Sequence, residues 1–78
     1  MSPDKLVRMA NQIGTFFAHQ GHGPDADETA VTAIAKHLDD FWDPRMRSAI
    51  IAHGATGGEG LDPLVKKAVE RLSVEAGA

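Results

Sequence analysis

Hydrophobic residues recur along the chain at spacings of three and four, which is the period of one face of an α-helix. The first stripe lies between residues 3 and 18 and comprises Leu6, Met9, Ala10, Ile13, Phe16 and Phe17. Ser2 and Pro3 predict that this helix starts at once, because Ser caps free backbone N–H groups and Pro fits the first helical turn. Gly14 interrupts the stripe and indicates either a close approach by another helix or a tolerated surface glycine.

Three further stripes follow the same period and predict helices over about residues 25–41, 44–53 and 63–73. Their apolar positions include Val31, Ile34, Ala35, Leu38, Phe41, Met46, Ala49, Ile50, Leu64, Val65, Ala68 and Leu72. No run alternates with period two, so we expect no strand. The sequence predicts an all-α fold, a compact small bundle of four short helices. We expect a single helical domain over residues 1–78, with a tail that frays from about residue 74.

Helix starts are marked by Asp residues. In Asp43-Pro44 and Asp62-Pro63, Asp can cap the backbone while Pro occupies the first helical position, where its missing N–H costs nothing. Asp25 with Glu28 three residues later fits a variant of the capping box. These pairs set the expected starts of the second, third and fourth helices.

Glycine-rich segments separate the predicted helices. Residues 19–24 contain two Gly and a Pro, and residues 54–60 contain four of the eight Gly in the chain, so both segments are expected to be loops. Gly54 is placed to stop the third helix in the left-handed conformation.

Composition narrows the function classes. A chain of 78 residues forms one domain at most, and a core of this size rarely supplies more than about 3–5 kcal/mol, so a partner would add stability. The chain has no Cys, which fits a reducing cytoplasm. No apolar run approaches the roughly 18 residues of a membrane span, and we expect a cytoplasmic protein with no membrane partner. The net charge of −3 argues against nucleic acid as a partner.

Candidate catalytic and metal sites lack the necessary context. The four histidines, His19, His22, His37 and His53, are poorly spaced for a metal site. The loop at 54–60 has no Lys for a phosphate, and Glu59 places a negative charge there. Asp39 and Asp40 diverge by about 100° on a helix, and no nucleophile motif is present. We therefore expect no catalytic, cofactor-binding or metal residue in this chain.

The segment 38–47 concentrates the only Trp with five charged residues, and it is the predicted docking site for another protein. Trp42, Arg45 and Arg47 are the candidate contacts, because Trp and Arg are enriched at binding hot spots. Glu59 in the later loop is a further candidate. Phe41 and Met46 are expected to face inward. Trp42 fits two roles equally, a core anchor or a partner contact.

Three segments together resemble the delta subunit of the cytoplasmic, NAD-dependent formate dehydrogenases that contain molybdenum or tungsten. They are residues 5–17 (KLVRMANQIGTFF), 41–47 (FWDPRMR) and 57–64 (GGEGLDPL). The resemblance implies a non-catalytic accessory subunit of a molybdoenzyme complex. Its role would be to stabilise assembly or the cofactor-loaded state of the catalytic subunit. It also implies that partner subunits carry the molybdopterin, iron–sulfur clusters, flavin and NAD site.

Two alternatives compete with this interpretation. A free-standing helical regulatory or nucleic-acid-binding module is favoured only if Lys66, Lys67 and Arg71 form a basic stripe. A histidine-based metal carrier is the third possibility. For the leading hypothesis, charge reversal at Arg45 and Arg47 is predicted to weaken complex formation while leaving the helix content almost unchanged.

Overall fold

The structure is a computed structural model that describes residues 2–20 and 23–77. Within these residues the chain forms four α-helices and no strand: α1 (Pro3–Ala18), α2 (Ala26–Phe41), α3 (Pro44–Ala55) and α4 (Pro63–Gly77). The predicted all-α bundle is confirmed. The main differences are at two C-terminal ends, where α3 reaches Ala55 instead of residue 53 and α4 reaches Gly77 instead of residue 73. Fraying of this tail stays a prediction.

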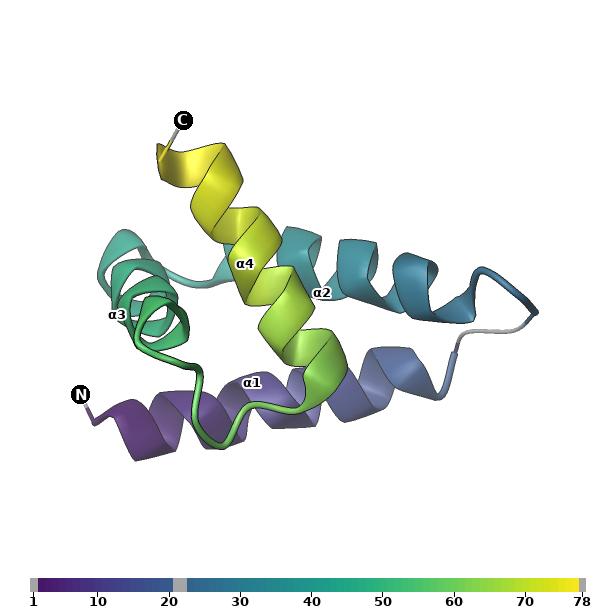
Figure 1. Cartoon of the computed structure of the whole chain (residues 1–78), viewed down its shortest axis with the longest axis horizontal. Helices are drawn as coiled ribbons and strands as arrows, with labels where there is room; N and C mark the ends of the chain where they lie inside the picture. The colour runs from purple at the N-terminus through teal and green to yellow at the C-terminus, as the bar shows by residue number, and fades with distance from the viewer. Residues whose placement is uncertain (1, 21–22, 78) are drawn as a thin grey trace.

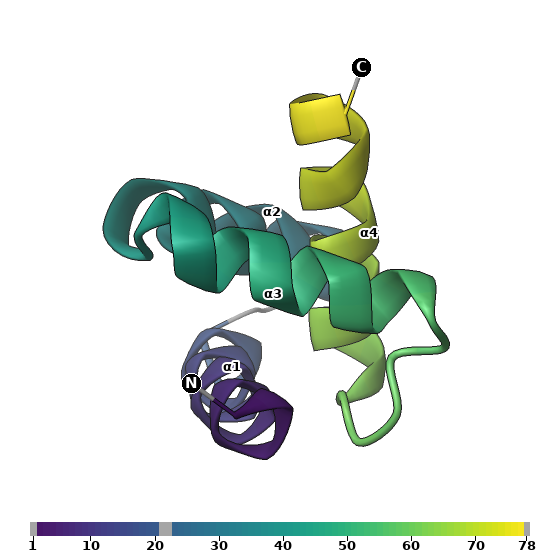
Figure 2. The same cartoon turned by 90° about the vertical axis from the view of Figure 1, so that its left-hand side faces the viewer.

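The helices form a small globule of 35 × 26 × 23 Å. Helices α1 and α2 lie side by side and run in opposite directions, while α4 crosses one face of this pair (Figure 1). Helix α3 lies near the N-terminal end of α1 and packs against both α1 and α4 (Figure 2). Within residues 2–20 and 23–77, no helix crosses the opposite face of the α1–α2 pair.

The core is built from all four helices. It contains Leu6, Ala10, Val31, Ile34, Ala35, Leu38, Trp42, Ile50, Val65, Ala68, Val69 and Leu72. No polar or charged side chain among the described residues is buried. Apolar burial is therefore the main force that holds these helices together.

Two glycines allow α4 to approach its neighbours closely. A Cβ added at Gly14 on α1 would lie 2.3 Å from Cγ2 of Val65 on α4. A Cβ added at Gly54 would lie 2.8 Å from Cγ1 of Val69. Gly14 therefore marks a helix contact, the first of the two alternatives that the sequence allowed.

The predicted left-handed stop at Gly54 is wrong. Gly54 lies inside α3, which continues to Ala55 and is followed by the C-cap Thr56. The positive φ occurs instead at Gly57, where it is 114°. The reason for a glycine at position 54 is the contact with α4, not the end of the helix.

The predicted caps are present at α1 and α3 but not at α2. Asp43 Oδ1 accepts a hydrogen bond from the Met46 backbone N–H at 2.8 Å, and Ser2 caps α1 in the same way. Asp25 precedes α2, but its side chain makes no capping hydrogen bond. The capping box predicted for Asp25 and Glu28 is therefore wrong. Glu28 pairs with Arg71 on α4 instead.

At the corner between α2 and α3, the inward direction expected for Phe41 is wrong, and of the two roles left open for Trp42 the structure favours burial. Phe41, expected to face inward, is 75% exposed, whereas Trp42 is only 6% exposed. Helix α2 ends at Phe41, and Trp42 is extended with φ −84° and ψ 138°, so the helical period no longer sets its direction. Trp42 closes this end of the core. Met46 packs against the core as expected.

Candidate functional site

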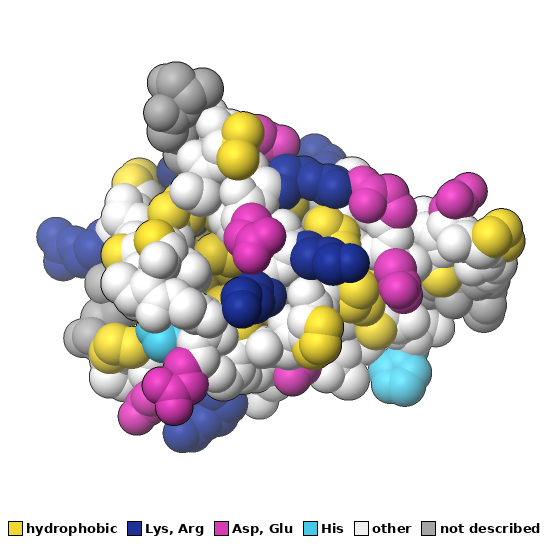
Figure 3. All heavy atoms as spheres, viewed as in Figure 1, with side chains coloured by type: hydrophobic (Ala, Val, Ile, Leu, Met, Phe, Trp, Pro, Cys, Tyr) yellow, Lys and Arg dark blue, Asp and Glu magenta, His cyan; other side chains and the backbone are white. Residues whose placement is uncertain are grey.

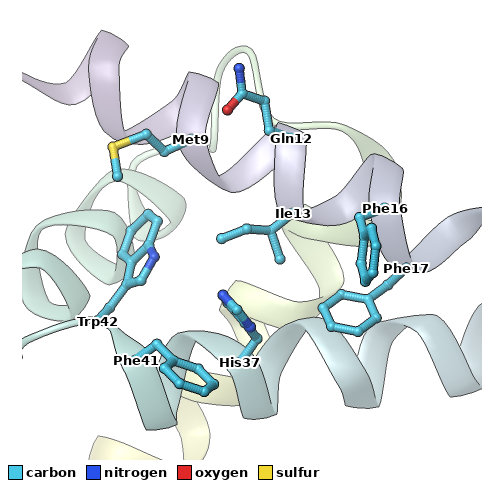
Figure 4. A pocket seen from close by; sticks show the side chains of 8 residues that line it. All are labelled: Met9, Gln12, Ile13, Phe16, Phe17, His37, Phe41 and Trp42. Atoms are coloured by element: carbon cyan, nitrogen blue, oxygen red, sulfur yellow. The ribbon is translucent and has the colours of Figure 1, made fainter.

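A groove of about 480 Å³ lies between α1 and the C-terminal half of α2. It is lined by Met9, Gln12, Ile13, Phe16, Phe17, His37, Phe41 and Trp42, which we call the aromatic groove. In Figure 4, Ile13, His37 and Trp42 lie in the space between the two helices, and α4 lies behind them. The groove therefore opens on the face of the α1–α2 pair that α4 leaves uncovered.

Four aromatic rings form a continuous row across this groove. Phe16 meets Phe17 edge to face, with ring centroids 5.1 Å apart. Phe17 lies 5.9 Å from the imidazole of His37, and His37 lies 4.7 Å from Phe41. Such ring pairs favour one another through their quadrupoles. The row joins α1 to α2 and holds its rings in fixed positions.

The ends of this row are exposed to solvent. Phe16 is 58% exposed and Phe41 is 75% exposed. Only one other large hydrophobic side chain among the described residues is exposed to this degree, Val74 on α4. Grouped exposed apolar side chains mark interaction surfaces, whereas single ones do not. The aromatic groove is therefore the strongest candidate binding surface in the described part of the chain.

Neighbouring aromatic residues differ in burial here. Successive residues on a helix diverge by about 100°, so Phe16 and Phe17 face different directions. Phe17 packs against the core and Phe16 does not. At the end of α2, Trp42 takes the core position and Phe41 is left outside.

The structure brings two of the four predicted contact residues to this region. Trp42 lines the aromatic groove, although most of its side chain is buried. Arg45 is exposed and lines an adjoining hollow, which shares Met9 with the groove. The sequence left the position of Trp42 open, and its burial now settles that it is mainly a core residue.

Arg47 acts within the chain. Its Nη1 donates to the backbone carbonyl of Asp39 at 2.9 Å and also to the carbonyl of Trp42. These carbonyls belong to the last turn of α2 and the residue after it, which have no partner within the helix. Arg47 therefore caps the C-terminus of α2, and its guanidinium also offsets the negative end of the helix dipole.

Glu59 lies away from the groove, on the loop between α3 and α4. His53 Nε2 donates to the Glu59 carbonyl at 2.7 Å. Asn11 holds the same loop on α1, through hydrogen bonds of 2.9 Å to the Gly60 carbonyl and from the Asp62 N–H. Asn11 diverges by about 200° from Met9 on the helix, so the loop covers a different face of α1.

Sequence reasoning missed the residues that form the row, namely Phe16, Phe17, His37 and Phe41. Their periodicity matched a buried stripe, so the sequence placed the phenylalanines in the core. A signal was nevertheless present. The sequence contains two pairs of adjacent aromatic residues, Phe16-Phe17 and Phe41-Trp42, and in each pair the structure leaves one ring exposed.

The described residues contain no cluster of three or more His, Asp or Glu side chains that could hold a metal ion. His37 is part of the aromatic row, and His19 is exposed. His22, one of the four candidate histidines, lies outside the described residues.

The basic residues of α4 do not form an uninterrupted stripe. Figure 3 shows acidic and basic side chains interleaved over the face where α4 lies. Arg71 is engaged by Glu28 and also donates to Thr32 at 2.7 Å. A nucleic-acid footprint needs clustered positive charge that is free to meet phosphates. This arrangement of charges does not favour that alternative. No helix in the described ranges is long and apolar enough to cross a membrane.

Comparison with known proteins identifies the family. The family model of the NADH-dependent formate dehydrogenase delta subunit FdsD matches residues 5–69, which is most of the 78-residue chain. Searches of curated proteins and of solved structures found no match. The matched range includes both helices that form the aromatic groove. The chain therefore belongs to the NADH-dependent formate dehydrogenase delta subunit family, FdsD.

Proposed function

We propose that this chain is a non-catalytic accessory subunit of a multisubunit NAD-dependent formate dehydrogenase. It docks on the catalytic subunit and stabilises either the assembly of the complex or the cofactor-loaded state of that subunit. Membership of the delta subunit family supports the choice of complex. The single observation that supports docking is the exposed row of aromatic rings between α1 and α2.

The chemistry of the chain supports an accessory role. It has no Cys, so it offers no thiolate for an iron–sulfur cluster. The glycine-rich loop at 54–60 lacks the Lys that a phosphate-binding loop requires. We therefore propose that the molybdopterin, iron–sulfur clusters, flavin and NAD site lie on partner subunits. Formate oxidation to carbon dioxide would then take place outside this chain.

Docking through the aromatic groove supplies a favourable free energy. A phenylalanine buries about 150–250 Å² when it is fully enclosed. Fully burying one such side chain contributes about 1.5–3 kcal/mol. Phe16 is 58% exposed and Phe41 is 75% exposed, so covering both would contribute roughly 2–4 kcal/mol before the entropic cost of association. This compares with the roughly 3–5 kcal/mol that a core of this size supplies. Binding would therefore stabilise this small subunit as well as the complex.

Reconstitution tests this function. Formate dehydrogenase subunits are expressed with and without this chain, and three quantities are measured: complex recovered on a sizing column, molybdenum content, and rate of formate oxidation. We expect the chain to elute with the complex and its omission to lower at least one of the three. A chain that neither elutes with the complex nor changes any of them would refute the proposal.

A further inference from the structure

The aromatic groove continues into a second hollow where α1 and α3 begin. This hollow has a volume of about 430 Å³ and is lined by Lys5, Leu6, Met9, Asp43, Arg45 and Met46. Met9 lines both hollows, and Trp42 of the first directly precedes Asp43 of the second. We call the two together the extended groove. It follows α1 from Phe16 back to Lys5, a length of roughly 16 Å at 1.5 Å per residue.

The walls of the extended groove restrict what can fill it. They are formed mainly by helices, whose backbone N–H and C=O groups are already paired within the helix. An extended segment placed there would leave its own backbone groups without partners, and each buried unpaired group is costly. An α-helix pairs its backbone internally and presents only side chains. About three turns of helix match the length of the groove.

Positive charge gathers at one end of the extended groove. Lys5 and Arg45 are both exposed there, and neither has an ion-pair partner within the described residues. The N-termini of α1 and α3 also lie at this end, and Asp4 and Asp43 offset the positive ends of their dipoles. The side chains of Lys5 and Arg45 therefore remain as the cations that a partner can meet. The aromatic end has no Lys, Arg, Asp or Glu among its lining residues.

We propose that the extended groove receives an amphipathic α-helix from another formate dehydrogenase subunit, with acidic residues in the turn that faces Lys5 and Arg45. The inference rests on the proposed function, because that function supplies the partner. Apolar side chains three, four and seven positions apart on the partner helix cover Ile13, Phe16 and Phe41. Its carboxylates offset the charge at the other end, which fixes the direction of the helix in the groove.

Photo-crosslinking in the assembled complex tests the occupant directly. A photoreactive amino acid replaces Phe41 in one full-length variant, Arg45 in a second and Val74, on α4, in a control. The crosslinked peptides are identified by mass spectrometry. We expect positions 41 and 45 to attach to one helix of another subunit, with acidic residues nearest position 45, and position 74 not to reach that helix. Attachment to a second copy of this chain, or to a non-helical segment, would overturn the inference.

Charge reversal at Arg45 tests separately whether acidic residues of the partner helix lie near this side chain. Arg45→Glu is compared with Lys67→Glu, an exposed position on α4, and binding to the remaining subunits is measured at low and high salt. We expect Arg45→Glu to raise the Kd at least about tenfold at low salt, with a smaller difference at high salt, and Lys67→Glu to leave the Kd unchanged. Equal affinities for the two variants would contradict the presence of acidic residues on the partner helix near Arg45.

These outcomes separate the inference from the proposed function. If the chain elutes with the complex and supports its activity but crosslinks elsewhere, the proposed function stands and the helix in the groove is refuted. A wild-type chain that fails to join the complex refutes the function itself. Circular dichroism of each variant checks that its helix content matches that of the wild type.

Discussion

The α1–α2 pair has two apolar faces, and they differ in exposure. On the face covered by α4, Gly14 allows Val65 to approach closely, and large residues such as Ile34 are fully buried. On the opposite face, Phe16 and Phe41 are bulky and remain exposed. Both faces follow the same helical period, so hydrophobic pattern alone does not distinguish them.

The two apolar faces differ in what covers them. Helix α4 covers one face, and we propose that a partner covers the other. Gly14 lets α4 pack closely on one face. On the other face, aromatic side chains line an open groove between α1 and α2, and no helix of the described residues lies across it. The core face should therefore govern folding and the groove face should govern assembly.

The largest effect should come from truncating a core residue. Ile34 is fully buried, and Ile34→Ala should lower the free energy of unfolding by about 2–5 kcal/mol, because it removes apolar contacts and leaves a cavity. Phe41→Ala, a larger truncation on the groove face, should change it by less than about 0.5 kcal/mol. Urea denaturation of both variants measures the contrast. Similar losses would mean that Phe41 belongs to the folding core.

A smaller effect is expected at the contact between α1 and α4. Alanine normally stabilises a helix relative to glycine by about 1 kcal/mol. Gly14→Ala should instead destabilise the chain by about 1–3 kcal/mol, because its Cβ would overlap Val65. In thermal denaturation, Val65→Ala in the Gly14→Ala background should cost less than in the wild type. A gain in stability for Gly14→Ala alone would contradict the close contact.

Arg45 and Arg47 should likewise differ in their effect on the stability of the chain. Arg47→Ala should cost about 1 kcal/mol of stability, because it removes hydrogen bonds to the end of α2. Arg45→Ala should change stability by less than about 0.5 kcal/mol. Charge reversal at Arg45 alone is therefore a cleaner test of docking than reversal at both arginines, because it does not disturb the cap of α2. Equal free energies of unfolding for the two variants, measured in urea, would contradict the capping role of Arg47.

The smallest effect should come from the exposed ion pair that joins α2 to α4. Glu28 and Arg71 are partly exposed, with side-chain exposures of 67% and 34%. Glu28→Gln should therefore cost at most about 0.5 kcal/mol, and the cost should shrink further in 1 M salt. Denaturation at low and high salt provides the measurement. A larger cost would contradict a minor role for this ion pair in holding α4 on α2.

The sequence predicted the fold better than the surface. Helical period, the Asp43-Pro44 cap and the helix start at Pro63 follow from local chemistry, and the structure agrees with them. Gly54 was misassigned because its reason is a contact with Val69, which is distant in sequence.

The candidate site was predicted only in part, for the same physical reason. Periodicity shows that Phe16 and Phe41 are on apolar stripes, but it does not show whether a helix covers each stripe. That depends on where α4 crosses the α1–α2 pair, which is a property of the assembled fold. Trp42 lies beyond the end of α2, so its direction followed no period at all. Docking through the segment 38–47 stays a prediction, and within it the inward direction expected for Phe41 is wrong.

The most direct test of the central claim compares two exposed hydrophobic residues. Phe41→Ala and Val74→Ala each truncate a side chain that is more than two-thirds exposed, one in the aromatic groove and one on α4. The Kd of each full-length variant for the other formate dehydrogenase subunits is measured by titration. If the aromatic groove is the docking surface, Phe41→Ala raises the Kd at least about tenfold while Val74→Ala leaves it unchanged. Equal affinities of both variants and the wild type would contradict docking through the aromatic groove.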